Sequence, residues 1–299
     1  MNLNDFFVYI TDFTHLDINL RTDEARKKYH DSWMARYKSA MNNWTEYDVA
    51  IWSVRCRQSL KLCFSSAYFA IEADRAEDDK VFASAYYLAY YSVLHAMWAV
   101  PYLHPEESLE RVTEITHSKI AKFFHSWFSQ SPDAIIKYNS RDLAENLRFM
   151  REYYSYRMPL NYPFGSKQGG FDPNKYSHRG FVKQCIQLSN LHSHLLRKSA
   201  ETHIKVGVSA NFPFAQEEKF NSDFFKINGK EHPDGVTKIL DPADRTALFE
   251  YKSMGCELLP HSNAYEHFFD EYMTYSEGAI AEPKTDIVQK TRSFVFSAL

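Results

Sequence analysis

The stretch SAYYLAYYSVLHAMWAV, residues 84–100, decides the fold because it contains no Asp, Glu, Lys or Arg. Four tyrosines, two serines and a histidine lie within it, whereas a membrane span is richer in Leu, Ile and Val. Apolar positions recur at three-four spacing on one helix face, at Phe82, Tyr86, Ala89, Val93 and Met97. We therefore expect no membrane span, but the central, buried helix of a bundle, which Pro101 and Pro105 end.

The composition narrows the class of protein. The chain of 299 residues is long enough for one large domain or two of ordinary size. Its net charge of -3 gives no general attraction to nucleic acid or to a membrane. The four cysteines form no CxxC pair, and the first residues lack the basic start of a secretory signal. These features predict a cytoplasmic protein without a zinc ribbon, and no motif calls for a cofactor or a metal.

Helical patterns cover most of the first 205 residues, and we expect helices at residues 22–41, 45–74, 78–100, 117–129, 140–158 and 181–204. Thr45 and Asp48 have the spacing of a capping box, and Asp78 and Asp79 favour the start of the next helix. The inner face of the fifth helix is expected at Leu143, Leu147, Met150, Tyr154 and Met158. A linker at 104–112 and a Gly- and Pro-rich loop at 159–180 separate these helices.

The sequence pattern changes after about residue 205, where residues typical of turns become frequent. Two short helices are expected there, one from Asp241-Pro242 and one around residues 263–276. Residues 286–299 fit either a strand or a docked extension. We predict a mainly α protein with a helical N-terminal extension (1–45), a helical bundle (46–204) and a mixed, irregular C-terminal appendage packed on the bundle (205–299).

Three segments in the middle of the chain resemble one known family. They are ASAYYLAYYSVLHAM (83–97), THSKIAKFF (116–124) and LRFMREYYSY (147–156). In this order and spacing they resemble the HEPN superfamily of helical bundles, in particular the members that pair with minimal nucleotidyltransferases. The third motif is represented by Leu147, Arg151, Ser155 and Tyr156, where Ser155 replaces an acid and Tyr154 a small residue. The resemblance covers about residues 50–160 and implies a HEPN-like bundle.

The resemblance also implies a function linked to RNA or nucleotides, in a bacterial toxin–antitoxin or anti-phage system. Catalytic members are metal-independent ribonucleases, usually dimeric, in which an Arg and a His four to six residues apart act near the start of a late helix. The 140–158 helix has Arg148, Arg151 and Arg157 but no histidine, so the standard nuclease motif is missing from its place. The spacing occurs once before that helix, from Arg111 to His117.

Charge and aromatic residues gather in one part of the chain. From Lys137 to Lys183 there are nine Lys or Arg and four Asp or Glu, a net charge of +5, interleaved with tyrosines. Cations for phosphates and rings for bases are what single-stranded nucleic acid or a nucleotide requires. The candidate binding residues are Arg148, Arg151, Tyr154, Tyr156 and Arg157. The alternative is a solvated helix face with core tyrosines, in which Arg151 pairs with an acid inside the bundle.

The histidines favour structural roles. His117 fits the first turn of a helix, and His95 fits a hydrogen-bonded core position. His192 and His194 are two residues apart, so they face opposite sides of a helix and do not share a metal ion.

The residues leave three functions open. The first is a HEPN-like protein that binds RNA or a nucleotide without cleaving it. The second is a metal-independent endoribonuclease whose displaced site uses Arg111, His117 and Arg151. The third is a non-enzymatic interaction subunit, with a nucleotidyltransferase, another protein or a second copy of the chain as its partner.

Overall fold

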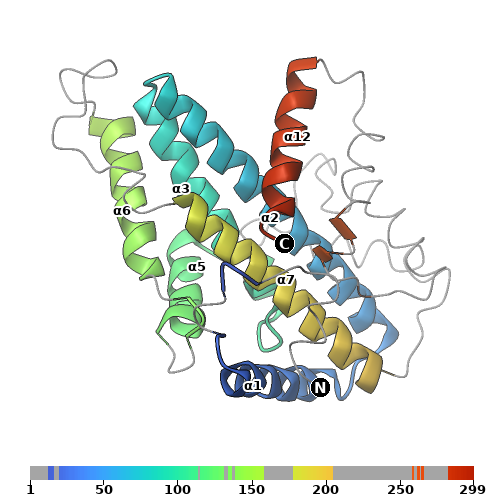
Figure 1. The fold of residues 1–299 in the computed structure, drawn as a ribbon. Helices are drawn as coiled ribbons and strands as arrows, with labels where there is room; N and C mark the ends of the chain where they lie inside the picture. Colours follow the sequence, from blue (N-terminus) through green and yellow to red (C-terminus); the bar gives the residue numbers. More distant parts are fainter. Residues whose placement is uncertain are drawn as a thin grey trace, which may run out of the picture.

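The structure is a computed structural model that describes residues 13–16, 20–113, 115–130, 134–136, 139–157, 178–204, 258, 261–262, 264–265 and 282–299. Helices dominate these residues, and none of them is in a strand (Figure 1). The main helices are α1 (Asp23–Met41), α2 (Glu46–Asp78), α3 (Phe82–Ala99), α4 (Leu109–Thr113), α5 (His117–Phe124), α6 (Ser140–Glu152), α7 (His178–His203) and α12 (Glu282–Phe296). The prediction of a mainly α bundle is therefore confirmed.

The first two helices begin where the sequence predicts, each with a side-chain cap. The Thr22 side chain accepts a hydrogen bond from the Ala25 N–H at the start of α1. The capping box at α2 is complete, because Thr45 Oγ1 accepts from the Asp48 N–H at 3.3 Å and the Thr45 N–H donates to Asp48 Oδ2 at 2.7 Å. In Figure 1, α1 crosses one end of the bundle, where it contacts α7.

The boundary between α2 and α3 differs from the prediction. Asp78 and Asp79 end α2, and α3 begins at Phe82 without a side-chain cap. Lys80 has a φ of 61°, in the left-handed region. The Lys80 N–H donates to the Glu77 carbonyl and the Val81 N–H to the Ala76 carbonyl, which is a Schellman motif. The two aspartates were expected to start a helix, but this chain reversal ends one.

Helix α3 lies at the centre of the bundle, in contact with α2, α5, α6 and α7. The predicted inner face is buried, including Ala89, Val93 and Met97. Tyr86 and Tyr90 are buried as well, but Tyr87 is 47% exposed. The tyrosines therefore divide into packing residues and surface residues. None of the described helices is both long and apolar enough to cross a membrane.

The later helices follow the predicted ranges with small shifts. The expected 117–129 helix is α5 continued by a π-helical turn, η4 (His125–Ser129), and the expected 140–158 helix is α6 continued by a second one, η5 (Tyr153–Arg157). The linker contains α4, which was not predicted. Helix α7 begins three residues before the expected start, and the rest of the loop (159–177) lies outside the described residues, as does Met158.

The end of the chain is helical, so the strand alternative for residues 286–299 is wrong. Helix α12 packs on α2, with Thr291, Phe294, Val295 and Ala298 buried at three-four spacing. The helix from Asp241-Pro242 lies outside the described residues, and so does most of the one at 263–276. His261 is buried against α2, and its Nε2 is hydrogen-bonded to Ser59 Oγ at 2.9 Å. The three domain boundaries stay predictions.

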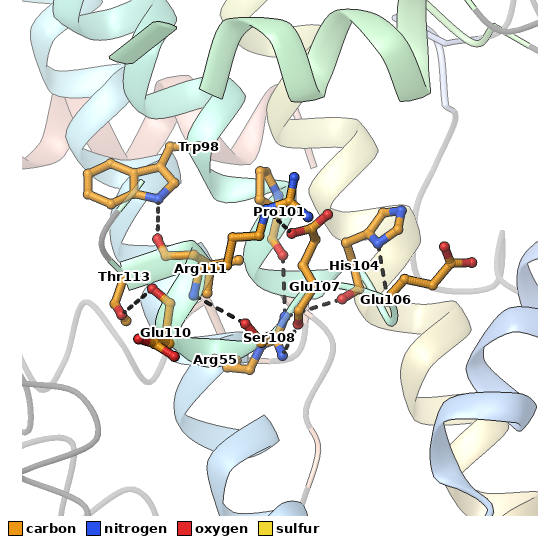
Figure 2. A network of polar contacts seen from close by, with 11 residues as sticks. Arg55, Trp98, Pro101, His104, Glu106, Glu107, Ser108, Glu110, Arg111 and Thr113 are labelled. Atoms are coloured by element: carbon orange, nitrogen blue, oxygen red, sulfur yellow. Dashed lines mark hydrogen bonds and ion pairs between the residues drawn. The ribbon is translucent and has the colours of Figure 1, made fainter. Parts of the chain in front are cut away.

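A buried arginine holds the segment that follows α3, which includes the 3-10 turn η3 (Pro101–Leu103). Arg55 is only 3% exposed, and its guanidinium lies 3.7 Å from the centre of the Trp52 ring. It donates to four carbonyls, those of Pro101, Tyr102, His104 and Glu107 (Figure 2). Because one side chain satisfies four carbonyls, it fixes the path from α3 towards α4 and α5.

Candidate nucleic-acid interface

Arg151 extends from the last turn of α6 onto two tyrosines of α3. Its guanidinium carbon lies 4.7 Å from the centre of the Tyr90 ring and 5.9 Å from that of Tyr91. Its Nη1 donates to the Tyr91 hydroxyl at 3.4 Å. The side chain is 15% exposed, and its buried Nε–H has no hydrogen-bond partner among the described residues. A cation held over aromatic faces is suited to binding an anion through the part of its guanidinium that remains exposed.

His117 meets the same two tyrosines from the first turn of α5. Its Nδ1 is hydrogen-bonded to the Tyr90 hydroxyl at 3.0 Å, and its ring lies edge-on to Tyr91, 5.8 Å between centres. Burial lowers the pKa of His117, and the nearby Arg151 and Arg148 lower it further. The imidazole is therefore held neutral near neutral pH. The structure thus brings together two of the three residues predicted to be catalytic.

The arginines at the end of α6 share one acid. Arg148 Nε lies 2.9 Å from Glu152 Oε1, and Arg151 Nη2 lies 3.3 Å from the same oxygen. Two cations and one carboxylate leave a local excess of positive charge. The expectation that Arg151 pairs with an acid in the bundle is met only in part, because this carboxylate is divided between two arginines.

An aromatic stripe runs along α3 through Tyr87, Tyr91, His95 and Trp98. Successive ring centres lie 4.7, 6.0 and 6.3 Å apart. Ser65 Oγ is hydrogen-bonded to His95 Nδ1 at 2.7 Å, and burial, helped by the charge of His117, lowers the pKa of His95 to about 4. The stripe was missed in the sequence, although its near-four spacing was a readable signal.

The exposed aromatics continue from the stripe onto the end of α6. Phe149 is 65% exposed and Tyr156 is 75% exposed. Burial raises the pKa of Tyr87, and the neighbouring phenols of Tyr91 and Tyr156 raise it further, so Tyr156 lies close to the exposed end of the stripe. We call the surface formed by Tyr87, Tyr91, His117, Arg148, Arg151 and Tyr156 the α3–α6 face.

Two other predicted binding residues have different surroundings. The Tyr154 ring stacks on Tyr86, 4.8 Å between centres and 9° between planes, in a small cluster with Phe82 and Met150. One face of the Tyr154 ring is therefore occupied by packing. Arg157 is exposed at the end of η5.

Arg111 lies in a different network, on α4. Its Nε is 3.0 Å from Glu107 Oε2, and its backbone N–H donates to Ser108 Oγ at 3.3 Å. Figure 2 shows both contacts beside Arg55, whose guanidinium binds the Glu107 carbonyl. The cations that act on the pKa of His117 are Arg151 and Arg148. The structure therefore pairs His117 with the α6 arginines, and it directs Arg111 towards Glu107.

The described residues contain no group of three or more His, Cys, Asp or Glu side chains placed to hold a metal ion. His192 and His194 point to different neighbours, as expected: His192 contacts Tyr29 and Tyr37, and His194 contacts Ser262.

Comparisons with protein-family models, with curated proteins and with solved structures found no match for the chain.

Proposed function

We propose that the α3–α6 face binds single-stranded RNA, the function that the resemblance to the HEPN superfamily leads us to expect. The observation that supports it best is the Arg151 guanidinium over the Tyr90 ring, next to the exposed Tyr87 and Tyr156. Proteins that bind single strands combine cations for the backbone with aromatic faces on which bases stack. The face offers both within one short stretch of surface.

The positive charge of this face supports RNA binding, although the chain as a whole is slightly acidic. Arg148 and Arg151 share the carboxylate of Glu152, while the chain as a whole carries a net charge of -3. Electrostatic attraction of RNA to this face would therefore come from these arginines and not from the net charge of the chain. Binding is expected to weaken as salt concentration rises, because each neutralised phosphate releases counterions.

The test compares a labelled single-stranded RNA of about 12 nucleotides with a duplex of the same length. Wild-type protein is compared with Tyr87→Ala and Tyr156→Ala, and Phe296→Ala serves as control because Phe296 is 67% exposed on α12. We expect preferential binding of the single strand, a loss of about fivefold or more in affinity for the two tyrosine variants, and no change for the control. Equal affinity for all four proteins would contradict the proposal.

A second candidate function is metal-independent RNA cleavage at the same face. It is favoured by His117, which burial and two arginines keep neutral and thus able to accept a proton. His117 would take the proton of a ribose 2′-hydroxyl, and the 2′-oxygen would attack the adjacent phosphorus. The bond to the 5′-oxygen would break, leaving a cyclic 2′,3′-phosphate. The 5′-oxygen would take a proton from water, and the resulting hydroxide would take the proton held by His117. Arg151 and Arg148 would offset the phosphate charge.

Incubating mixed RNA with the protein in the presence of a metal chelator distinguishes cleavage from binding alone. Cleavage by wild type that His117→Ala abolishes would establish the nuclease. Intact RNA that shifts on a native gel would support binding alone. If RNA is neither cleaved nor shifted, the exposed aromatics are better explained as an interface with a protein partner or a second copy of the chain, and RNA binding is overturned.

A further inference from the structure

A hollow separate from the α3–α6 face lies where α7 and α12 meet α2. It has a volume of about 430 Å³, within the range of small-molecule sites. Its lining includes Arg179 and Lys183 from α7, Lys290, Ser293 and Phe294 from α12, and Ile71 from α2. Helix α6 packs on α3, whereas α12 packs on α2, so the two surfaces are built from different helices.

Two cations of this hollow share one aromatic ring. The Arg179 guanidinium carbon lies 5.2 Å from the centre of the Phe294 ring, and Lys183 Nζ lies 5.3 Å from it. Arg179 and Lys183 are four residues apart on α7, so their side chains are neighbours on one helix face. Like charges at this spacing repel each other, and a ring offsets this repulsion less well than an anion does.

The carboxylates near the hollow leave one of its cations without an acid. Asp74 Oδ2 pairs with Arg179 at 2.6 Å, and Asp286 Oδ2 pairs with Lys290 at 2.7 Å. No carboxylate among the described residues forms an ion pair with Lys183. Burial lowers the pKa of Lys183, and the charge of Arg179 lowers it further. His15 lies close by, since burial and then the charge of Lys183 lower its pKa too.

We propose that this hollow binds a small phosphorylated molecule, whose phosphate is held between Arg179 and Lys183 beside the hydroxyl of Ser293. A guanidinium fork and an ammonium are the side chains that proteins use for phosphate. A bound phosphate neutralises the charge of Lys183 and relieves its repulsion by Arg179. The site does not depend on the proposed function of the α3–α6 face.

The experiment titrates the full chain with inorganic pyrophosphate, AMP and adenosine by calorimetry at constant ionic strength. Four proteins are compared: wild type, Lys183→Met, Lys198→Met and Ser293→Val. Lys198 is the matched control, a half-buried lysine of the same helix that pairs with Glu201. Ser293→Val, at an exposed position of α12, is a second change in the lining of the hollow and leaves the α7 cations unchanged. Far-UV circular dichroism verifies that each variant is folded.

We expect saturable binding of pyrophosphate and AMP, but not of adenosine, by wild type and Lys198→Met. Lys183→Met should bind about tenfold more weakly, and Ser293→Val should also weaken binding. Absence of saturable heat with both phosphates, or wild-type affinity in Lys183→Met, would overturn the proposal.

Discussion

The Arg151 guanidinium on α6 lies over the ring of Tyr90 on α3, 4.7 Å from its centre, and the hydroxyl of that tyrosine is hydrogen-bonded to His117. One buried tyrosine thus connects a cation and an imidazole that are 34 positions apart in the sequence. The contact joins three helices at one point of the surface. The protonation state of His117 therefore depends on the arginines of α6.

The first prediction concerns that dependence. Arg148→Gln removes a positive charge that lowers the pKa of His117, so the pKa should rise. Histidine proton resonances followed by NMR over a pH titration give the value directly. Arg141→Gln is the control, because Arg141 is similarly exposed on α6 and also pairs with a glutamate four residues later. A His117 pKa that stays the same or falls in Arg148→Gln would contradict the geometry of the face.

A second prediction concerns stability in acid. Burial lowers the pKa of His192 to about 3, so the folded protein keeps this imidazole neutral. The unfolded chain protonates it near its ordinary pKa of about 6.5. Stability is therefore full above that pH and falls as the pH drops below it. For His192 the loss between pH 7 and pH 5 is about 2 kcal/mol.

Urea unfolding of wild type and His192→Gln at several pH values tests this prediction. Removing the histidine is expected to flatten the dependence on pH, even if the variant is less stable at every pH. His104, His194 and His261 add to the wild-type slope, because burial lowers the pKa of each to about 2, 4 and 3 respectively. An identical pH slope in wild type and His192→Gln would show that His192 is not held neutral in the fold.

A third prediction concerns Arg55. In Arg55→Met the four carbonyls bound by this side chain lose their donor while most of them stay buried. We expect the free energy of unfolding to fall by about 3 kcal/mol or more, since each unpaired buried group costs about 1 to 3 kcal/mol. Arg141→Met, an exposed arginine, should change it by less than about 0.5 kcal/mol. Comparable urea midpoints for the two variants would be inconsistent with the network in Figure 2.

A fourth prediction concerns the turn after α2. Lys80 has a φ of 61°, which costs a residue with a side chain more than it costs glycine. Lys80→Gly is therefore expected to stabilise the protein by about 0.5 to 1 kcal/mol, measured by thermal or urea unfolding. A destabilised Lys80→Gly variant would mean that the Lys80 side chain contributes more than the backbone strain costs.

Local features of the sequence were enough to predict most helices. The capping box of Thr45 and Asp48 and the three-four spacing along α3 depend only on near neighbours, and both are confirmed. The predicted start of α3 was wrong because the preference of Asp78 and Asp79 for a helix N-terminus does not decide the boundary here. The chain reverses direction at Lys80, which adopts the left-handed conformation. A glycine usually signals this conformation in a sequence, and none is present here.

The candidate site was harder to predict from the sequence than the helices were. Arg151 and His117 are brought together by the packing of α5 and α6 on α3, which no local spacing records. Linear spacing instead linked His117 with Arg111, but the ion pair with Glu107 directs Arg111 elsewhere. The exposure of the tyrosines could not be predicted either. The packing of η5 on α3 covers one face of the Tyr154 ring and leaves Tyr87 exposed.

The most direct test of the central claim is the affinity for single-stranded RNA of wild type, Arg151→Gln and Arg141→Gln, measured by fluorescence anisotropy over a range of salt concentrations. Circular dichroism and thermal unfolding confirm that all three are folded. We expect Arg151→Gln to bind about tenfold more weakly, with a shallower dependence on salt, and Arg141→Gln to bind like wild type. Wild-type affinity and salt dependence in Arg151→Gln would contradict the assignment of the α3–α6 face as an RNA-binding surface.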